Sequence, residues 1–149
     1  MSLQNVALKF VTISNVSGES YENGIDEESP AFKARFGLSL DTADFGEDND
    51  YSFTVTQKFE TLFTENSEPF FKMEIVGHFF ATQPEGVKDW IDTEEAAYIL
   101  GSTLYPYLRN LSKPLLEGLG AAQIDFPWSS PPITKIAAKK TKRKLVKKL

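Results

Sequence analysis

The sequence predicts an α+β fold in which a four-stranded antiparallel sheet is covered on one face by a long helix. Segments with apolar residues at every second position come first and extend to Ala81, as expected for strands with one buried face. A segment with apolar residues at every third or fourth position follows from Asp92, as expected for an amphipathic helix. Consecutive strands with short links, followed by a helical region, favour an antiparallel sheet that packs against a helix.

The four expected strands follow one another along the chain. The first lies at residues 6–14, where β-branched and aromatic residues are mixed, and the second at residues 34–40. The third, at residues 51–63, shows the clearest alternation, and a polar turn separates it from the fourth at residues 70–81. The apolar positions of the last two strands are Tyr51, Phe53, Val55, Phe59, Phe63, Phe71, Met73, Ile75 and Phe79.

The helix is expected to begin after Asp92, an N-cap residue that forms a capping-box pattern with Glu95. Pro106 lies inside the helix, where the loss of a backbone hydrogen bond costs roughly 3 kcal/mol. We therefore expect packing against the sheet to hold the helix in place, and the glycines of 118–120 to end it. The predicted apolar stripe consists of Ala97, Leu100, Leu104, Leu108, Leu111 and Leu115.

Length and composition fit one domain, since 149 residues with 41% hydrophobic content are enough for one core. The absence of cysteine excludes disulfides and thiolate metal sites. No apolar run approaches the ~20 residues of a membrane span. The first ten residues lack a basic region followed by an apolar segment, so we expect no signal peptide and a cytoplasmic location.

The net charge of −5 conceals a division of the chain into an acidic body and a basic tail. Residues 1–132, the expected domain, contain 8 basic and 21 acidic residues, whereas residues 133–149 contain 8 basic residues and no acid. We expect this tail to be flexible or helical. Four interpretations stay open: a solvated tail, docking on the acidic body of its own or a neighbouring subunit, contact with anionic lipid or ribosomal RNA, and a partner-binding segment.

The residues that carry chemistry do not predict an enzyme. His78 is the only histidine, and no serine or cysteine nucleophile motif accompanies it. The acidic segment 41–50 lacks the ligand spacing of a calcium loop, and no phosphate-binding glycine loop occurs. We therefore expect no cofactor and no metal. Twelve phenylalanines and two tryptophans exceed what one sheet and one helix readily bury, which predicts an apolar interface.

Several short segments resemble the export chaperone SecB and its SecB-like relatives, in the same order along the chain. Leu104–Arg109, with the sequence Leu-Tyr-Pro-Tyr-Leu-Arg, is similar to the family's Leu-Phe-Pro-Tyr-x-Arg helix signature. The other matching segments are Leu38–Ala43, Tyr51–Thr64, Phe71–Ile75, Gly77–Phe80 and Gly118–Pro127. Together they span residues 5–128.

The resemblance implies an ATP-independent holdase that binds unfolded polypeptides or preproteins in hydrophobic grooves and assembles as a homo-oligomer, a dimer of dimers. Phe36 and Phe71 match aromatic groove positions, and Phe32 lies in the connection between the first two strands. We expect Phe126 and Trp128 to add to this client-binding set.

The resemblance also implies a surface that faces the SecA motor. Glu74 matches an acidic position on the sheet face that SecB presents to SecA, and Glu19 or Glu22 matches acids near the first strand.

Three features depart from the family's pattern. Lys72 stands where the SecA-facing surface carries leucine. Trp128–Pro132 stands where an Asn-Phe pair opens a second helix, and the tail is a lysine cluster. The sequence thus leaves three alternatives: a chaperone for protein export, a chaperone dedicated to one partner such as an antitoxin, and an adaptor that binds membrane or RNA through its tail.

Overall fold

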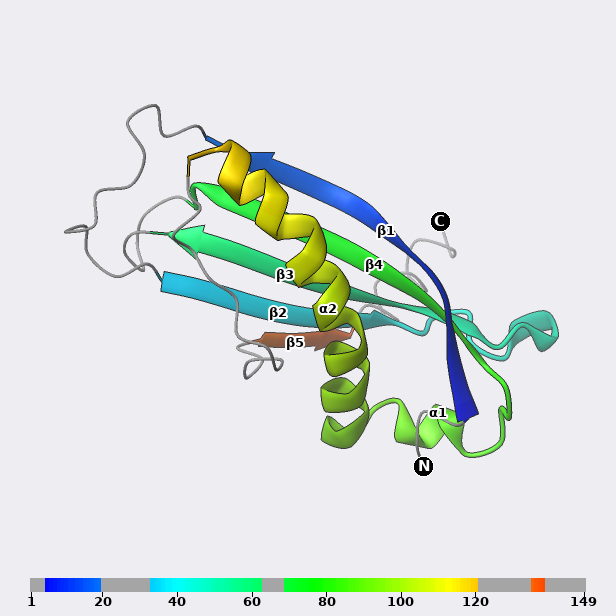
Figure 1. Ribbon diagram of the computed structural model, residues 1–149. Coiled ribbons are helices and arrows are strands. Elements are labelled where there is room, and N and C mark those ends of the chain that lie inside the picture. Colours follow the sequence, from blue (N-terminus) through cyan, green and yellow to red (C-terminus); the bar gives the residue numbers. More distant parts are fainter. Residues whose placement is uncertain (1–4, 20–32, 63–68, 121–134, 139–149) are drawn as a thin grey trace, which may run out of the picture.

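The computed structural model describes residues 5–19, 33–62, 69–120 and 135–138 and confirms the predicted α+β fold (Figure 1). Four antiparallel strands form the main sheet, and a long helix, α2 (Glu94–Gly118), crosses one of its faces. The strands are β1 (Val6–Gly18), β2 (Lys33–Asp41), β3 (Ser52–Leu62) and β4 (Phe71–Ala81). The strands lie side by side in the order β1-β4-β3-β2, followed by the short strand β5 (Lys135–Ala138).

The two faces of the sheet differ because side chains alternate along β3 and β4. The odd-numbered residues face α2 and are buried, and they include Val55, Met73 and Ile75, none of which is exposed. The even-numbered residues are mostly polar and lie on the opposite side, which we call the outer face. The core therefore lies between the sheet and α2, as the alternation predicted.

Helix α2 begins one residue later than predicted. Its N-cap is Thr93, whose Oγ1 accepts a hydrogen bond of 3.1 Å from the backbone N–H of Ala96. The predicted capping box of Asp92 and Glu95 is therefore wrong: Thr93 has the extended backbone of an N-cap, and its third following residue is alanine.

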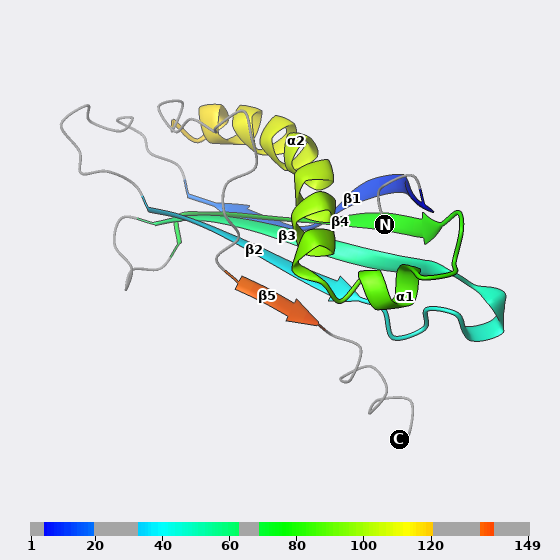
Figure 2. The same cartoon turned by 90° about the horizontal axis from the view of Figure 1, so that it is seen from below.

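The buried face of α2 agrees with the predicted stripe over the first half of the helix only. Leu104 and Leu108 are buried, but Leu111 and Leu115 are exposed, and Ser112 and Leu116 are buried in their place. The stripe thus continues at a spacing of four residues. The axis of α2 bends part-way along its length (Figures 1 and 2), as expected for a helix with prolines in its interior.

The described residues contain three elements that the sequence did not indicate, one of which is a 3-10 helix at Glu47–Asn49 in the acidic loop. A short helix, α1 (Val87–Trp90), precedes α2. Strand β5 pairs with β2 in parallel, so four residues of the tail that was expected to be flexible or helical extend the sheet. Among the described residues no helix is both long and apolar enough to cross a membrane.

Candidate functional site

The two predicted client-binding aromatics in the described residues lie in the core. Phe36 is 8% exposed, and its ring centroid lies 5.0 Å from that of Phe59 and 6.1 Å from that of Tyr105 in α2. Phe71 is 1% exposed and lies 6.1 Å from Phe59. Phe59 thus joins both rings in one row across β2, β3 and β4.

This placement gives Phe36 and Phe71 a structural role, because both rings fill space between the sheet and α2. Their contact with a client stays a prediction. Phe32, Phe126 and Trp128 lie outside the described residues, so the predicted set is not brought together here.

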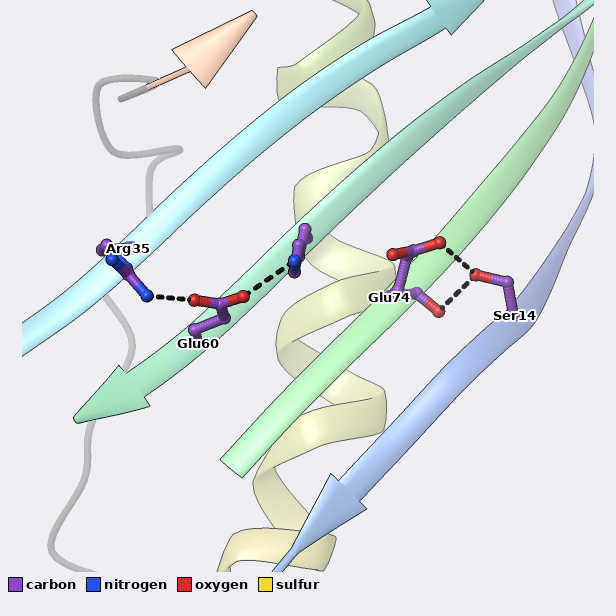
Figure 3. Close-up of polar contacts among 5 residues, drawn as sticks. Ser14, Arg35, Glu60 and Glu74 are labelled. Carbon is purple, nitrogen blue, oxygen red and sulfur yellow. Dashed lines mark hydrogen bonds and ion pairs between the residues drawn. The ribbon is translucent and has the colours of Figure 1, made fainter. Parts of the chain in front are cut away.

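Two of the predicted SecA-facing acids lie in the described residues, one on β4 and one just after β1. Glu74 is on the outer face, where Ser14 Oγ donates to its carboxylate at 3.0 Å and lies 3.2 Å from its backbone carbonyl (Figure 3). Glu19 is exposed just after β1, and its backbone N–H donates to the carbonyl of Phe70. Glu22 lies outside the described residues.

Charges on the outer face are paired within β3 and across neighbouring strands, so this face is not uniformly acidic. Glu60 accepts from Arg35 at 2.6 Å and from Lys58 at 2.8 Å (Figure 3). In the strand register Glu60 also stands opposite Lys72, and Lys58 opposite Glu74. Opposite charges at facing positions stabilise a sheet by ~0.2–1 kcal/mol per pair. The outer face of the described chain therefore alternates in charge.

The carboxyl of Glu60 is a charged group on this face with a shifted pKa. Burial alone would raise its pKa. The hydrogen bonds and positive charges of Lys58 and Arg35 together lower the pKa by more than burial raises it. The net result is a pKa below its ordinary value, so Glu60 is ionised at neutral pH. A fixed, paired charge serves the sheet and does not suit proton transfer.

Exposed apolar side chains occur on β1 and on α2. Ile13 and Val16 stand opposite the buried Ile75 and Met73, so they face the side of the sheet that α2 crosses, yet they are 46% and 44% exposed. On α2 three exposed apolar residues recur every four positions: Tyr107, Leu111 and Leu115. We call these five residues the β1–α2 apolar surface. Helix α2, which carries three of the five, lies over the face of the sheet toward which Ile13 and Val16 point (Figure 2).

Strand β1 adds unpaired backbone to this surface because it is an edge strand of the described sheet. Its register with β4 shifts between Leu8 and Phe10 and again between Ile13 and Asn15. Such bulges bend an edge strand and interrupt its pairing pattern. The sequence did not indicate this surface, because Leu111 and Leu115 fit the core stripe and alternation does not show which strand is at the edge.

His78 lies on the outer face beside β1. Its ring stacks on Phe10 with centroids 4.2 Å apart, and its Nε2 lies 3.4 Å from Thr12 Oγ1. No group of three or more histidines, cysteines or acids in the described residues is arranged to hold a metal ion. His78 is therefore explained by packing and one hydroxyl contact.

Comparison with solved structures relates the fold to that of a known protein. No family model matches the chain, and no curated protein matches it. A solved structure, the SecB-like chaperone Rv1957 of Mycobacterium tuberculosis in complex with a ChAD peptide from the antitoxin HigA1, matches with a TM-score of 0.56. The match covers 83% of this chain and 90% of that chain at 15% sequence identity. The chain therefore has a SecB-like fold.

Proposed function

We propose that the protein is a holdase chaperone that binds non-native polypeptides without ATP. The observation that carries this proposal is the likeness of its sheet and helix to a chaperone that was solved with a peptide bound. The β1–α2 apolar surface supports it, because Tyr107, Leu111 and Leu115 form a row along α2, and a contiguous exposed apolar patch commonly marks an interaction site.

The chemistry of this surface suits unfolded clients. Burial of each large apolar side chain from a client contributes ~1.5–3 kcal/mol and requires little sequence specificity. Strand β1, at the edge of the sheet that the described residues form, offers backbone N–H and C=O groups to an extended segment. A folded protein hides both its apolar side chains and its backbone, so the surface discriminates by folding state.

The same surface suits assembly of subunits, and we propose a homo-oligomer built as a dimer of dimers in the cytoplasm. Ile13 and Val16 on an edge strand fit a second copy as well as they fit a client. Measuring the oligomeric state and the client protection of each variant shows which residues of the β1–α2 apolar surface contact a neighbouring subunit and which contact a client.

Two client sets are compatible with this chemistry: exported precursors and one dedicated partner. Delivery of precursors to the SecA motor would use Glu19, Glu22 and Glu74. The alternating charges around Lys72 favour the dedicated partner, because a basic residue on this face departs from a uniformly acidic docking surface. An antitoxin is one such partner, as in the neighbour's complex.

The test is suppression of aggregation when a denatured client is diluted into buffer. The full chain in molar excess should keep the client in solution without ATP; no suppression at any ratio would reject the proposal. The double variant Tyr107→Ser, Leu111→Ser should protect less than the matched control Asn110→Ser, Glu117→Ser, which alters two exposed polar residues of α2. Light scattering on each variant reports whether the oligomer is preserved.

An adaptor that binds membrane or RNA through its basic tail is the alternative from a different class. Deletion of residues 139–149 removes seven basic residues and retains β5. The holdase retains client protection after this deletion, whereas an adaptor loses its binding and protects no client before or after.

A further inference from the structure

A cavity of about 680 Å³ lies between the acidic loop Asp41–Asp50 and the region of α1, and the proposed function does not use it. Its apolar lining includes Phe45, Tyr51 and the buried Ile91. Its exposed rim carries three acids, Glu47, Glu85 and Asp92, and one base, Lys88, so the rim is acidic on balance. An apolar interior with an acidic rim suits a peptide segment that carries both aliphatic and basic side chains.

The acidic side of the cavity is held in shape by the loop itself. The ring of Phe45 packs edge-on against Tyr51, with centroids 5.7 Å apart, and against Phe53 at 6.0 Å. The backbone N–H of Gly46 donates to the carbonyl of Asp50 at 2.7 Å, and the φ of 88° at Gly46 is a conformation that suits glycine. A preformed cavity binds a segment at a lower entropic cost than a loop that must first become ordered.

Strand β5 brings one such segment to the cavity. It runs parallel to β2, with Leu38 opposite Ile136 and Leu40 opposite Ala138. Adjacent strands lie ~4.8 Å apart, so the chain leaves Ala138 beside the end of β2. Thr42, which lines the cavity, is two residues beyond Leu40. Figure 2 shows β5 pointing toward the end of the sheet where α1 lies.

The segment that follows β5 has the matching chemistry. Residues 139–149 contain seven lysines and arginines and no acid, together with Leu145, Val146 and Leu149. The loop Asp41–Asp50 contains five acids and no base. We propose that residues 139–149 dock in this cavity of their own chain, with basic side chains toward the acidic rim and aliphatic side chains toward the apolar lining.

This proposal is independent of the holdase proposal, since either can fail without the other. Cross-linking within residues 1–149 tests it, because this sequence contains no cysteine and any disulfide must join the two cysteines that are introduced. The pair Thr42→Cys, Val146→Cys joins the cavity to the tail. The control pair Thr56→Cys, Val146→Cys uses a site on the outer face, in the row of Ser39 and Ala137. A freely moving tail reaches both sites with similar ease.

If the tail docks, the pair Thr42→Cys, Val146→Cys should form its disulfide about tenfold faster under mild oxidation than the pair Thr56→Cys, Val146→Cys. The reason is that docking raises the concentration of residue 146 near the cavity. Equal rates would overturn the proposal, and so would a disulfide that forms only between two chains. Mass spectrometry of chains in two isotopic forms separates these outcomes. Circular dichroism confirms that both variants are folded.

Charge variants test whether the acids of the rim hold the basic residues of 139–149 in the cavity. Glu47→Gln combined with Glu85→Gln should slow cross-linking at Thr42→Cys about fivefold, within the range for two exposed ion pairs. Glu117→Gln, at the end of α2, should leave it unchanged.

Binding of the full chain to phosphatidylserine vesicles gives a second readout. If the tail is docked, the rim variants release it and raise vesicle binding about fivefold, by the same ion-pair range. Unchanged vesicle binding would mean that the tail is already free, and it would reject the proposal.

Discussion

Gly77 of β4 lies directly beneath Leu104 of α2, so closely that a Cβ atom on Gly77 would stand 2.5 Å from Leu104 Cδ2. It would also stand 2.8 Å from Cε2 of Phe79. Leu104 is fully buried, and its helix carries an interior proline. The missing side chain at position 77 therefore lets α2 approach the sheet and bury its central turn.

Gly77→Ala should accordingly destabilise the protein by ~1–3 kcal/mol, the usual cost of overpacking a core. Gly118→Ala is the matched control, because a Cβ atom there meets nothing within 4 Å. Alanine at a helix end is expected to be neutral or to stabilise by up to ~1 kcal/mol. Urea unfolding of both variants measures the difference. Equal stabilities would show that α2 does not rest on Gly77.

The N-cap of α2 gives a second prediction. Thr93→Ala removes the hydroxyl that accepts from the Ala96 N–H and should cost ~1 kcal/mol of stability. Asp92→Ala changes the neighbouring exposed residue and should cost less than ~0.5 kcal/mol. Thermal unfolding ranks the two variants, and the reverse order would restore Asp92 as the cap.

Burial predicts opposite outcomes for two kinds of apolar residue. Phe71→Ala empties a position that is 1% exposed and should cost ~3–5 kcal/mol of stability. Leu111→Ala removes an exposed side chain and should cost less than ~0.5 kcal/mol, while it weakens client protection. A loss of protection in Phe71→Ala is therefore interpretable only alongside its unfolding curve. Wild-type stability in Phe71→Ala would contradict its place in the core.

The paired carboxyl of Glu60 makes stability depend on pH. Its pKa is lower in the folded protein than in the unfolded chain, so the stabilisation is complete above the unfolded value, about 4.5, and is lost as pH falls through the folded value. Glu60→Gln should therefore destabilise the protein more at pH 7 than at pH 3. Urea unfolding at both pH values measures this. A deficit that stays constant with pH would contradict the account.

Much of the fold follows from local sequence because the strands have one apolar face and one polar face. The alternation at Phe53, Val55 and Phe59 allows only one orientation of β3. The half of α2 after Leu108 could not be predicted in this way. Its periodicity fits either Leu111 or Ser112 as the next buried position, and the angle at which α2 crosses the sheet decides between them.

The candidate site was less predictable than the fold. The sequence predicts Phe36 and Phe71 as groove residues because they match aromatic positions of the SecB-like pattern. Such a match carries no information about exposure, and both side chains are buried. Ile13 and Val16 are exposed, but isoleucine and valine are equally common on the buried face of a strand, so their residue types do not reveal this. Strand β5 has only Ile136 and two alanines between lysines, and its pairing with β2 depends on contacts distant in sequence.

Binding of an unfolded chain, compared with the folded form of the same chain, tests the central claim most directly. Fluorescence anisotropy of a labelled polypeptide that is permanently unfolded, titrated with the protein in the absence of ATP, gives the affinity. The account predicts saturable binding of the unfolded form with a Kd of about 1 μM or tighter, which corresponds to ~8 kcal/mol from a few buried apolar side chains. It predicts no measurable binding of the folded form. Equal binding of both forms, or binding of neither, would contradict it.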